Sequence, residues 1–265
     1  MIDECVPLIR ALGEGRYGVA IGGSRGKGLA TSRSDYDFRL YCDAIRGGTA
    51  YFETVAWTRF VEAVDIWRAE GLEIDHVWMR TFGDIEAALQ PWLEGEIHPL
   101  ALDWTLWGYH LLPDLYHQQI LDDPYGLLAE WKERLRVYPP KLKQALVTKH
   151  LGLLRYWRGD YHYANKVERG DAVFLASMSA RLVHDLMQVL FALNETYYVG
   201  DGNNLDFARE FAVLPPQFAE RVELALYPEA TEDRFALQRQ TLIGLIDDVE
   251  RLADYESGKS PTSLS

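Results

Sequence analysis

The stretch "VAIGGSRGKGLATSRSDYDFRLYCD", residues 19–43, is the most informative part of the sequence about the fold. It opens with a short apolar run that predicts a strand, continues through a Gly-Gly-Ser turn and a polar loop, and ends in a second apolar run over residues 36–42. Because successive side chains of a strand point to opposite faces, Asp35 and Asp37 emerge together while the apolar residues between and after them face a core. The stretch therefore predicts two strands of a sheet, with paired carboxylates on one rigid edge.

Paired carboxylates of this kind predict a metal site. Two carboxylates held close together repel each other, and hard oxygen ligands of this type select Mg²⁺ or Mn²⁺, which relieves the repulsion. Asp75 lies in an apolar context on what would be a neighbouring strand, so it could supply a third carboxylate, and three acids can hold two ions. Arg39 shares the face of the acids and is expected to be a local salt-bridge partner. The alternative for the acids is a solvated strand edge.

The turn before the acids predicts phosphate binding. Gly22, Gly23 and Ser24 follow the apolar strand, and such a turn can bring backbone N–H groups close to a phosphate, with a hydroxyl as an additional donor. Arg25 and Lys27 then add positive charge, although a solvated loop is the alternative for both. No Asp and His pair is recognisably placed to serve Ser24, so we do not expect a hydrolase nucleophile at this position.

The first part of the chain alternates strand and helix patterns. One helix is predicted over residues 53–70 and ends at Gly71, since glycine commonly terminates helices. The predicted strands lie at residues 17–23, 36–42, 72–80 and within 117–126. This pattern indicates a mixed sheet with flanking helices.

The second part of the chain is predicted to be helical. Long helical patterns cover residues 141–159, 171–198 and 231–256. We expect a first domain over residues 1–126, a helical domain over residues 127–256 and a flexible tail over residues 257–265. The predicted fold class is α+β, in which an N-terminal mixed sheet with helices precedes an all-α bundle.

The length and net charge of the chain indicate which classes of molecule it can bind. The chain has 265 residues, of which 48% are hydrophobic, so it can bury a sizeable core. Its formal net charge of -13 argues against nucleic acid as the main partner, because phosphate neutralisation needs clustered Lys and Arg. A cationic or neutral small molecule fits this charge better.

Two further features bear on the cellular setting. No uninterrupted apolar run approaches the roughly 18 residues of a membrane helix, and the N-terminus is acidic where a signal peptide would be basic, so we expect a cytoplasmic protein without a membrane partner. Cys5 and Cys42 lack metal-ligand spacing and are expected to be small core residues. The sequence does not indicate an oligomeric state.

The order of these features resembles the DNA polymerase β-like nucleotidyltransferase superfamily. The signature of that superfamily is a Gly-Ser turn, a short loop and an alternating pair of acids on a strand, present here as "GGS", "RGKGLATSRS" and "DYD" over residues 22–37. Within the superfamily the chain is similar to bacterial aminoglycoside nucleotidyltransferases and their relatives. These pair a small catalytic domain with a C-terminal helical domain, so the resemblance implies a polymerase-β-like fold for the first domain.

The resemblance also implies roles for the residues of the motif. Ser24 and the adjacent backbone, Gly22 and Gly23 included, would hold the outer phosphates of a nucleotide, with Arg25 and Lys27 steadying the triphosphate. The paired acids would bind Mg²⁺, and the third acid would be a metal ligand or a general base. The implied reaction is in-line attack by a substrate hydroxyl on the α-phosphate of ATP or another nucleoside triphosphate, after which pyrophosphate departs.

The helical half contributes weaker candidates. Its most polar interruptions are "HYANKVERGD" and "ALNETYYVGDGNN". Candidates for closing over nucleotide or acceptor are Lys166, Arg169, Asp171, Asn194 and Tyr198, and of these Lys166, Arg169 and Tyr198 are predicted to bind the nucleotide.

Several functions share this motif. The leading hypothesis is transfer of AMP from ATP to a hydroxyl of a small, cationic acceptor such as an aminoglycoside. One alternative keeps the chemistry but makes the acceptor a protein, as in toxin-antitoxin pairs. Another is a nucleotide-binding module without turnover. Transfer to RNA is the last alternative, and the acidic balance of the chain argues against it.

Overall fold

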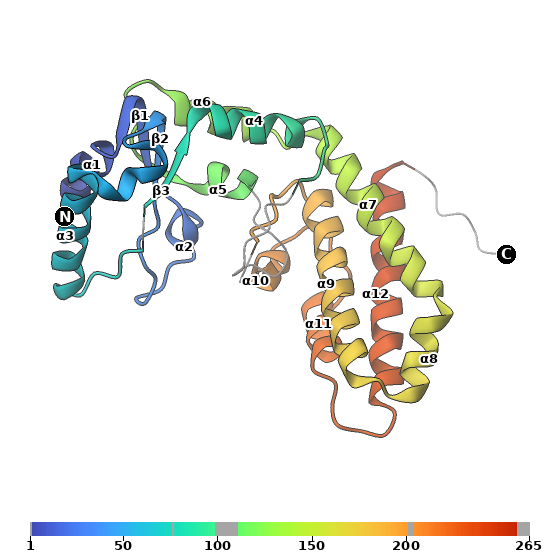
Figure 1. Ribbon diagram of the computed structural model, residues 1–265. Coiled ribbons are helices and arrows are strands. Elements are labelled where there is room, and N and C mark those ends of the chain that lie inside the picture. The colour runs from blue at the N-terminus through green and yellow to red at the C-terminus, as the bar shows by residue number, and fades with distance from the viewer. Residues whose placement is uncertain (1, 76, 99–110, 201–203, 259–265) are drawn as a thin grey trace. The chain divides into compact units, whose positions relative to one another are not determined.

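The computed structural model contains two compact units. The residues it describes are 2–75, 77–98, 111–200 and 204–258. The first unit comprises the described residues up to Trp92 together with residues 111–137, and the second comprises residues 93–98 and the described residues from Tyr138 onward. The first unit carries the sheet and the second is helical (Figure 1), which confirms the predicted α+β class.

The first unit is built on a mixed sheet of four described strands. The strands are β1 (Gly13–Ile21), β2 (Phe38–Ile45), β3 (Trp78–Thr81) and β4 (Gln119–Asp122), in the order β3-β2-β1-β4. β1 is antiparallel to both β2 and β4, whereas β2 and β3 are parallel. The mixed sheet agrees with the prediction, and β1 and β2 form its centre.

Helices cover both faces of this sheet (Figure 1). The helical elements of the unit are α1 (Ile2–Arg10), α2 (Gly23–Gly26), η1 (Gly48–Glu53), α3 (Val55–Ala69), α4 (Phe82–Leu93), α5 (Leu111–His117) and α6 (Leu127–Leu135). On one face, α1 and α3 pack against the inward side chains of β1 and β2 in a single core. That core includes Cys5 and Cys42, which are free buried thiols, as expected.

On the opposite face of the sheet, α6 packs against β1 and β2, and these contacts move the domain boundary from its expected position. Leu128 of α6 packs so closely on Gly18 of β1 that a Cβ at position 18 would overlap with it. Trp131 packs edge-on against Tyr41 of β2, with 5.1 Å between the ring centroids. The predicted boundary after residue 126 is therefore wrong: α6 completes the core of the first unit, whose last residue is Val137.

Two predicted strands are shorter or shifted. Among the described residues of the apolar run at 72–80, the strand β3 begins only at Trp78, and Ile74 forms an isolated parallel bridge with Tyr36 ahead of it. β2 likewise begins at Phe38, immediately after the paired acids. Asp37 and Asp75 thus lie on the segments that lead into two neighbouring parallel strands.

The second unit is a helical bundle around α9. Its helices are α7 (Pro140–Gly159), α8 (Tyr161–Arg169), α9 (Ala172–Leu193), α10 (Asn204–Arg209), α11 (Phe218–Leu226) and α12 (Arg234–Glu256). Among the described residues, α9 alone is long and apolar enough to cross a membrane by length and composition, but 61% of its apolar window is buried. It is the central helix of the core formed with α7, α11 and α12.

One polar cluster lies inside this bundle. His150 of α7 and Asp185 of α9 are buried, with 2.7 Å between Nδ1 and Oδ1. The neighbouring ring of His184 lies edge-on to His150, and burial lowers the pKa of His184 to about 4. The bundle therefore holds His184 in its neutral form at physiological pH.

His184 should make the protein sensitive to mild acid. Between pH 6.5 and about 4 the unfolded chain binds a proton at His184 that the folded chain does not, so stability falls as the pH falls through this window. The wild type should lose on the order of 1 kcal/mol more than His184→Gln between pH 7 and pH 5, measured by chemical unfolding. Parallel stability curves for the two proteins would contradict the assignment.

Candidate active site

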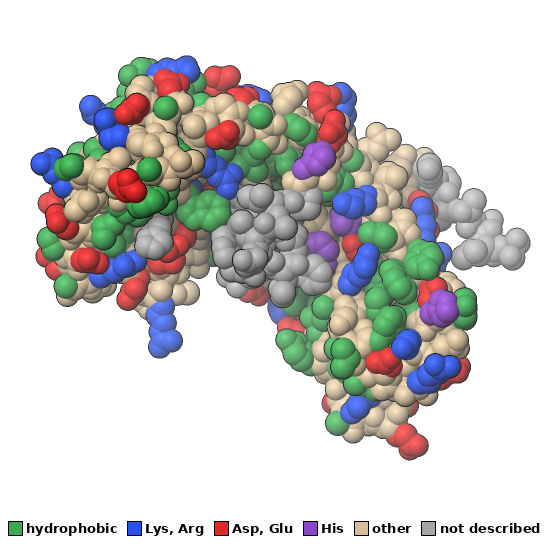
Figure 2. Space-filling model, in the orientation of Figure 1, with side chains coloured by type: hydrophobic (Ala, Val, Ile, Leu, Met, Phe, Trp, Pro, Cys, Tyr) green, Lys and Arg blue, Asp and Glu red, His purple; other side chains and the backbone are tan. Residues whose placement is uncertain are grey.

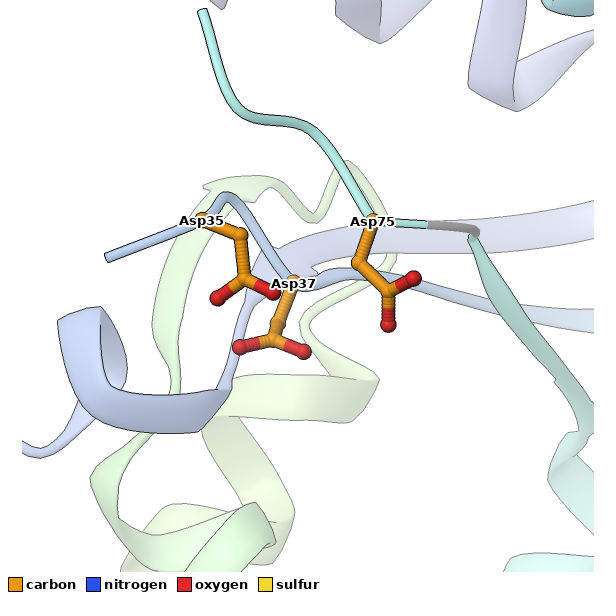
Figure 3. Close-up of side chains that lie close together, drawn as sticks. All are labelled: Asp35, Asp37 and Asp75. Carbon is orange, nitrogen blue, oxygen red and sulfur yellow. The ribbon is translucent and has the colours of Figure 1, made fainter. Parts of the chain in front are cut away.

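Three carboxylates meet just ahead of the starts of β2 and β3, and the sequence predicts that they come together. Each of Asp35, Asp37 and Asp75 offers one carboxylate oxygen, and these atoms all lie within 4.8 Å of one another. Figure 3 shows the three carboxyl groups gathered on the same side of the segments that carry them. All three residues are half-buried, so solvent and a ligand can reach them. We call this group the acid cluster.

Backbone pairing explains why a residue forty positions downstream joins the other two. The Tyr36 N–H donates to the Glu73 carbonyl at 2.9 Å, and the Asp75 N–H donates to the Tyr36 carbonyl at 3.2 Å. Tyr36 stacks on Phe38, with 6.2 Å between the ring centroids, and both side chains face the apolar core. Alternation then directs the flanking acids to the other face.

The electrostatics of the acid cluster favour a bound cation. Burial raises the pKa of Asp37, the carboxylates of Asp35, Asp75 and Asp114 raise it further, and the positive charge of Arg39 opposes them. Carboxylate oxygens are the ligands that Mg²⁺ and Mn²⁺ prefer, and a divalent cation would offset the mutual repulsion of the cluster. The donor set therefore fits the metal that the sequence predicts.

The glycine turn packs directly against the cluster. The Gly22 N–H donates to the Asp37 carbonyl at 2.9 Å, and Gly23 adopts a left-handed backbone with φ of +58°. A Cβ on Gly23 would overlap with Oδ2 of Asp37. Ser24 follows in α2, a single turn whose first N–H groups have no intrahelical acceptor. The turn thus lies where phosphate oxygens near the acids could meet N–H groups and a hydroxyl.

The two cations of the loop have different surroundings. The Arg25 guanidinium donates to the carbonyls of Ser34, at 2.5 Å, and Asp35, at 2.8 Å, and it lies 3.8 Å from the centroid of the Tyr36 ring. These contacts of Arg25 therefore stabilise the loop that carries the acids. Lys27 is half-buried at the end of α2. That either residue contacts a triphosphate stays a prediction.

Asp114, a charged residue near the cluster, is not indicated by the sequence. Arg39 is 3.8 Å from Asp37, as the expected local partner, but its shorter contact is to Asp114 of α5, at 3.0 Å. Asp114 is buried and lies 75 positions from Arg39. No motif surrounds it, and only the pairing of distant segments could have identified it.

The candidates of the helical unit have contacts within that unit. Lys166 pairs with Asp171 at 2.6 Å, and Asp171 caps α9 by accepting from the Phe174 N–H. Asn194 hydrogen-bonds the backbone of Val213 through both ends of its amide. Tyr198 is buried in the bundle core.

Arg169 lies on the surface, in the last turn of α8. Nothing in these contacts requires a ligand. Nucleotide binding by Lys166, Arg169 and Tyr198 stays a prediction.

Comparisons with known proteins give limited similarity. The model of a family described as "Domain of unknown function (DUF4037)" matches residues 104–201, less than half of the chain. No curated protein matches the sequence. Among solved structures, the chain is similar to a nucleotidyltransferase-like protein from Exiguobacterium sibiricum, with 12% identity and a TM-score of 0.47, over 91% of this chain and 71% of that one. The acid cluster and the turn beside it, rather than these similarities, indicate what the site does.

Proposed function

We propose that the protein is a Mg²⁺-dependent nucleotidyltransferase. In this proposal it transfers AMP from ATP to a hydroxyl group of a small acceptor. A bond forms between the acceptor oxygen and the α-phosphorus, the bond between the α-phosphorus and the bridging oxygen breaks, and pyrophosphate leaves. The observation that supports this proposal most is the convergence of three carboxylate oxygens within 4.8 Å of one another, beside a glycine turn.

In this proposal the residues of the site have three roles: they hold the metal, accept a proton and orient the phosphates. Asp35 and Asp37 would hold the metal, and Asp75 would either complete the ligand set or accept the proton of the attacking hydroxyl. Bound Mg²⁺ supplies Lewis-acid stabilisation of charge on phosphoryl oxygens. The backbone at Gly23 and the Ser24 hydroxyl would orient the outer phosphates, because N–H groups at the start of a helical turn suit anions.

The charge of the protein favours a cationic acceptor such as an aminoglycoside. The net charge is -13, so a polycation would be attracted over a distance of about one Debye length. On the face seen in Figure 2, the basic side chains of the described residues lie among acidic ones rather than in one continuous band. Such a face does not favour RNA as the acceptor.

A pyrophosphate-release assay tests the proposal. Each of the four nucleoside triphosphates is supplied with Mg²⁺ and a panel of aminoglycosides, and we expect release that requires both ATP and an acceptor. If none of the aminoglycosides supports release while calorimetry still detects binding of Mg-ATP, the search moves to protein or other small-molecule acceptors. Failure to bind any Mg-nucleotide would contradict the proposal.

A further inference from the structure

We propose that Asp114 is a positioning residue for the acid cluster. It holds Arg39 in a buried ion pair and thereby leaves the Asp37 carboxylate to the metal. This inference rests on the proposed function, because it concerns the same metal site. It adds a residue from α5, outside the motif, to the apparatus of the site.

The pair between Arg39 and Asp114 has bidentate geometry. Nε of Arg39 donates to Oδ2 of Asp114 at 3.0 Å, and Nη2 donates to Oδ1 at 3.2 Å. The two side chains are 7% and 8% exposed. Paired guanidinium and carboxylate groups of this geometry are among the strongest hydrogen-bonded pairs in proteins. The contact of this guanidinium with Asp37 is longer, with 3.8 Å between Nη1 and Oδ1.

Other groups hold the guanidinium in the same place. A Cβ at Gly22 would come within 2.8 Å of three guanidinium atoms, so the turn packs directly on Arg39. Nη1 also donates to the Phe38 carbonyl at 3.4 Å, and the Trp78 ring centroid lies 5.2 Å from the guanidinium carbon. The side chain is therefore enclosed, and its charge stays beside the cluster whether or not Asp114 balances it.

The consequence is a competition for Asp37. A guanidinium and a divalent cation both seek carboxylate oxygens, and a buried Arg without a counter-charge is strongly unfavourable. If Asp114 loses its charge, the nearby carboxylate of Asp37 is drawn more strongly to Arg39. The metal must then displace an ion pair before it binds. Asp114 acts on the metal through Arg39, not by contact.

The test measures Mn²⁺ affinity of the full chain by titration calorimetry. Asp114→Asn should weaken Mn²⁺ binding by about tenfold or more, the usual effect of losing a residue that orients a metal ligand. Adding Arg39→Met to that variant should restore the affinity to within about threefold of the wild type, because the competing cation is gone. Asp84→Asn, which removes an exposed charge on α4, is the control and should bind as the wild type does.

Thermal unfolding of each variant, followed by circular dichroism, fixes a temperature at which all are folded. A merely structural pair would lower the unfolding temperature of Asp114→Asn but leave the affinity of its folded form unchanged, and that result would overturn the inference. If Asp114→Asn does not fold, the Asp114→Asn, Arg39→Met double variant decides: affinity near that of the wild type supports the inference, and a loss beyond about tenfold overturns it.

The outcome for the wild type separates this inference from the proposed function. If the wild type binds no Mn²⁺, or binds it equally well with Asp35 and Asp37 changed to asparagine, the proposed metal site is wrong and the role of Asp114 falls with it. If the wild type binds Mn²⁺ through the cluster and folded Asp114→Asn binds it equally well, only the role of Asp114 is wrong.

Discussion

Changing Asp35 and Asp37 together to asparagine is expected to abolish Mn²⁺ binding and to lower nucleotidyl transfer by about a thousandfold or more. The physical reason is that the variant removes two of the three carboxylates that converge within 4.8 Å, leaving Asp75 alone to hold a divalent cation. Titration calorimetry with Mn²⁺ measures the first effect, and pyrophosphate release measures the second.

The same double variant should fold at least as well as the wild type when no metal is present. The pKa of Asp37 is raised by burial and by the neighbouring carboxylates, so the folded state holds its proton more tightly than the unfolded state does. Stability contributed by this group therefore falls as the pH rises from 3.8 through the raised pKa, and at neutral pH the charged form opposes folding. Neutral asparagines remove that penalty, and added Mn²⁺ should raise the unfolding temperature of the wild type only.

A matched variant controls for the loss of two charges. Glu62 and Asp65 are exposed on α3, outside the acid cluster, and changing them to glutamine and asparagine alters the net charge equally. This control should bind Mn²⁺ and transfer nucleotide as the wild type does. Equal losses in both double variants would indicate a general effect of surface charge and would remove the support for a metal at the cluster.

The acid cluster could be predicted because its signals are local. Alternation places Asp35 and Asp37 on one side of the backbone, and this holds although β2 begins only at Phe38, because Tyr36 between them pairs with Ile74. Asp75 could also be predicted, because the apolar pattern around it predicts a neighbouring strand. Among the described residues at that point, the structure has an isolated bridge between Tyr36 and Ile74 in place of a full strand. Carboxylates on neighbouring segments of one sheet then meet without further information.

The features that escaped prediction depend on distant pairings. Asp114 acquires its role only because α5 packs where Arg39 can reach it, and nothing in the sequence around either residue indicates this. The misplaced domain boundary has the same cause. The pattern of α6 is helical like that of the second unit, but Leu128 fits the space left by Gly18 on the sheet. Helix propensity identifies a helix and does not reveal which core it completes.

Gly23→Ala is expected to damage both the fold and the site. Gly23 has φ of +58°, a backbone conformation that is unfavourable for alanine, and the added Cβ would overlap with Oδ2 of Asp37. Either the turn or the carboxylate must move. We expect the free energy of unfolding to fall by about 3 kcal/mol. We expect Mn²⁺ affinity to fall by at least about tenfold, because Asp37 is displaced.

Gly28→Ala is the matched control for the backbone conformation. Gly28 lies five positions downstream with φ of +73°, and no atom of the described residues lies within 4 Å of the position that its Cβ would take. Its substitution should lower the free energy of unfolding by about 1 kcal/mol and leave Mn²⁺ affinity unchanged. The difference between the two variants measures the collision with Asp37 alone. If both lose the same stability and both retain Mn²⁺ binding, the turn does not pack against Asp37, and phosphates held at Gly23 could not lie beside the metal.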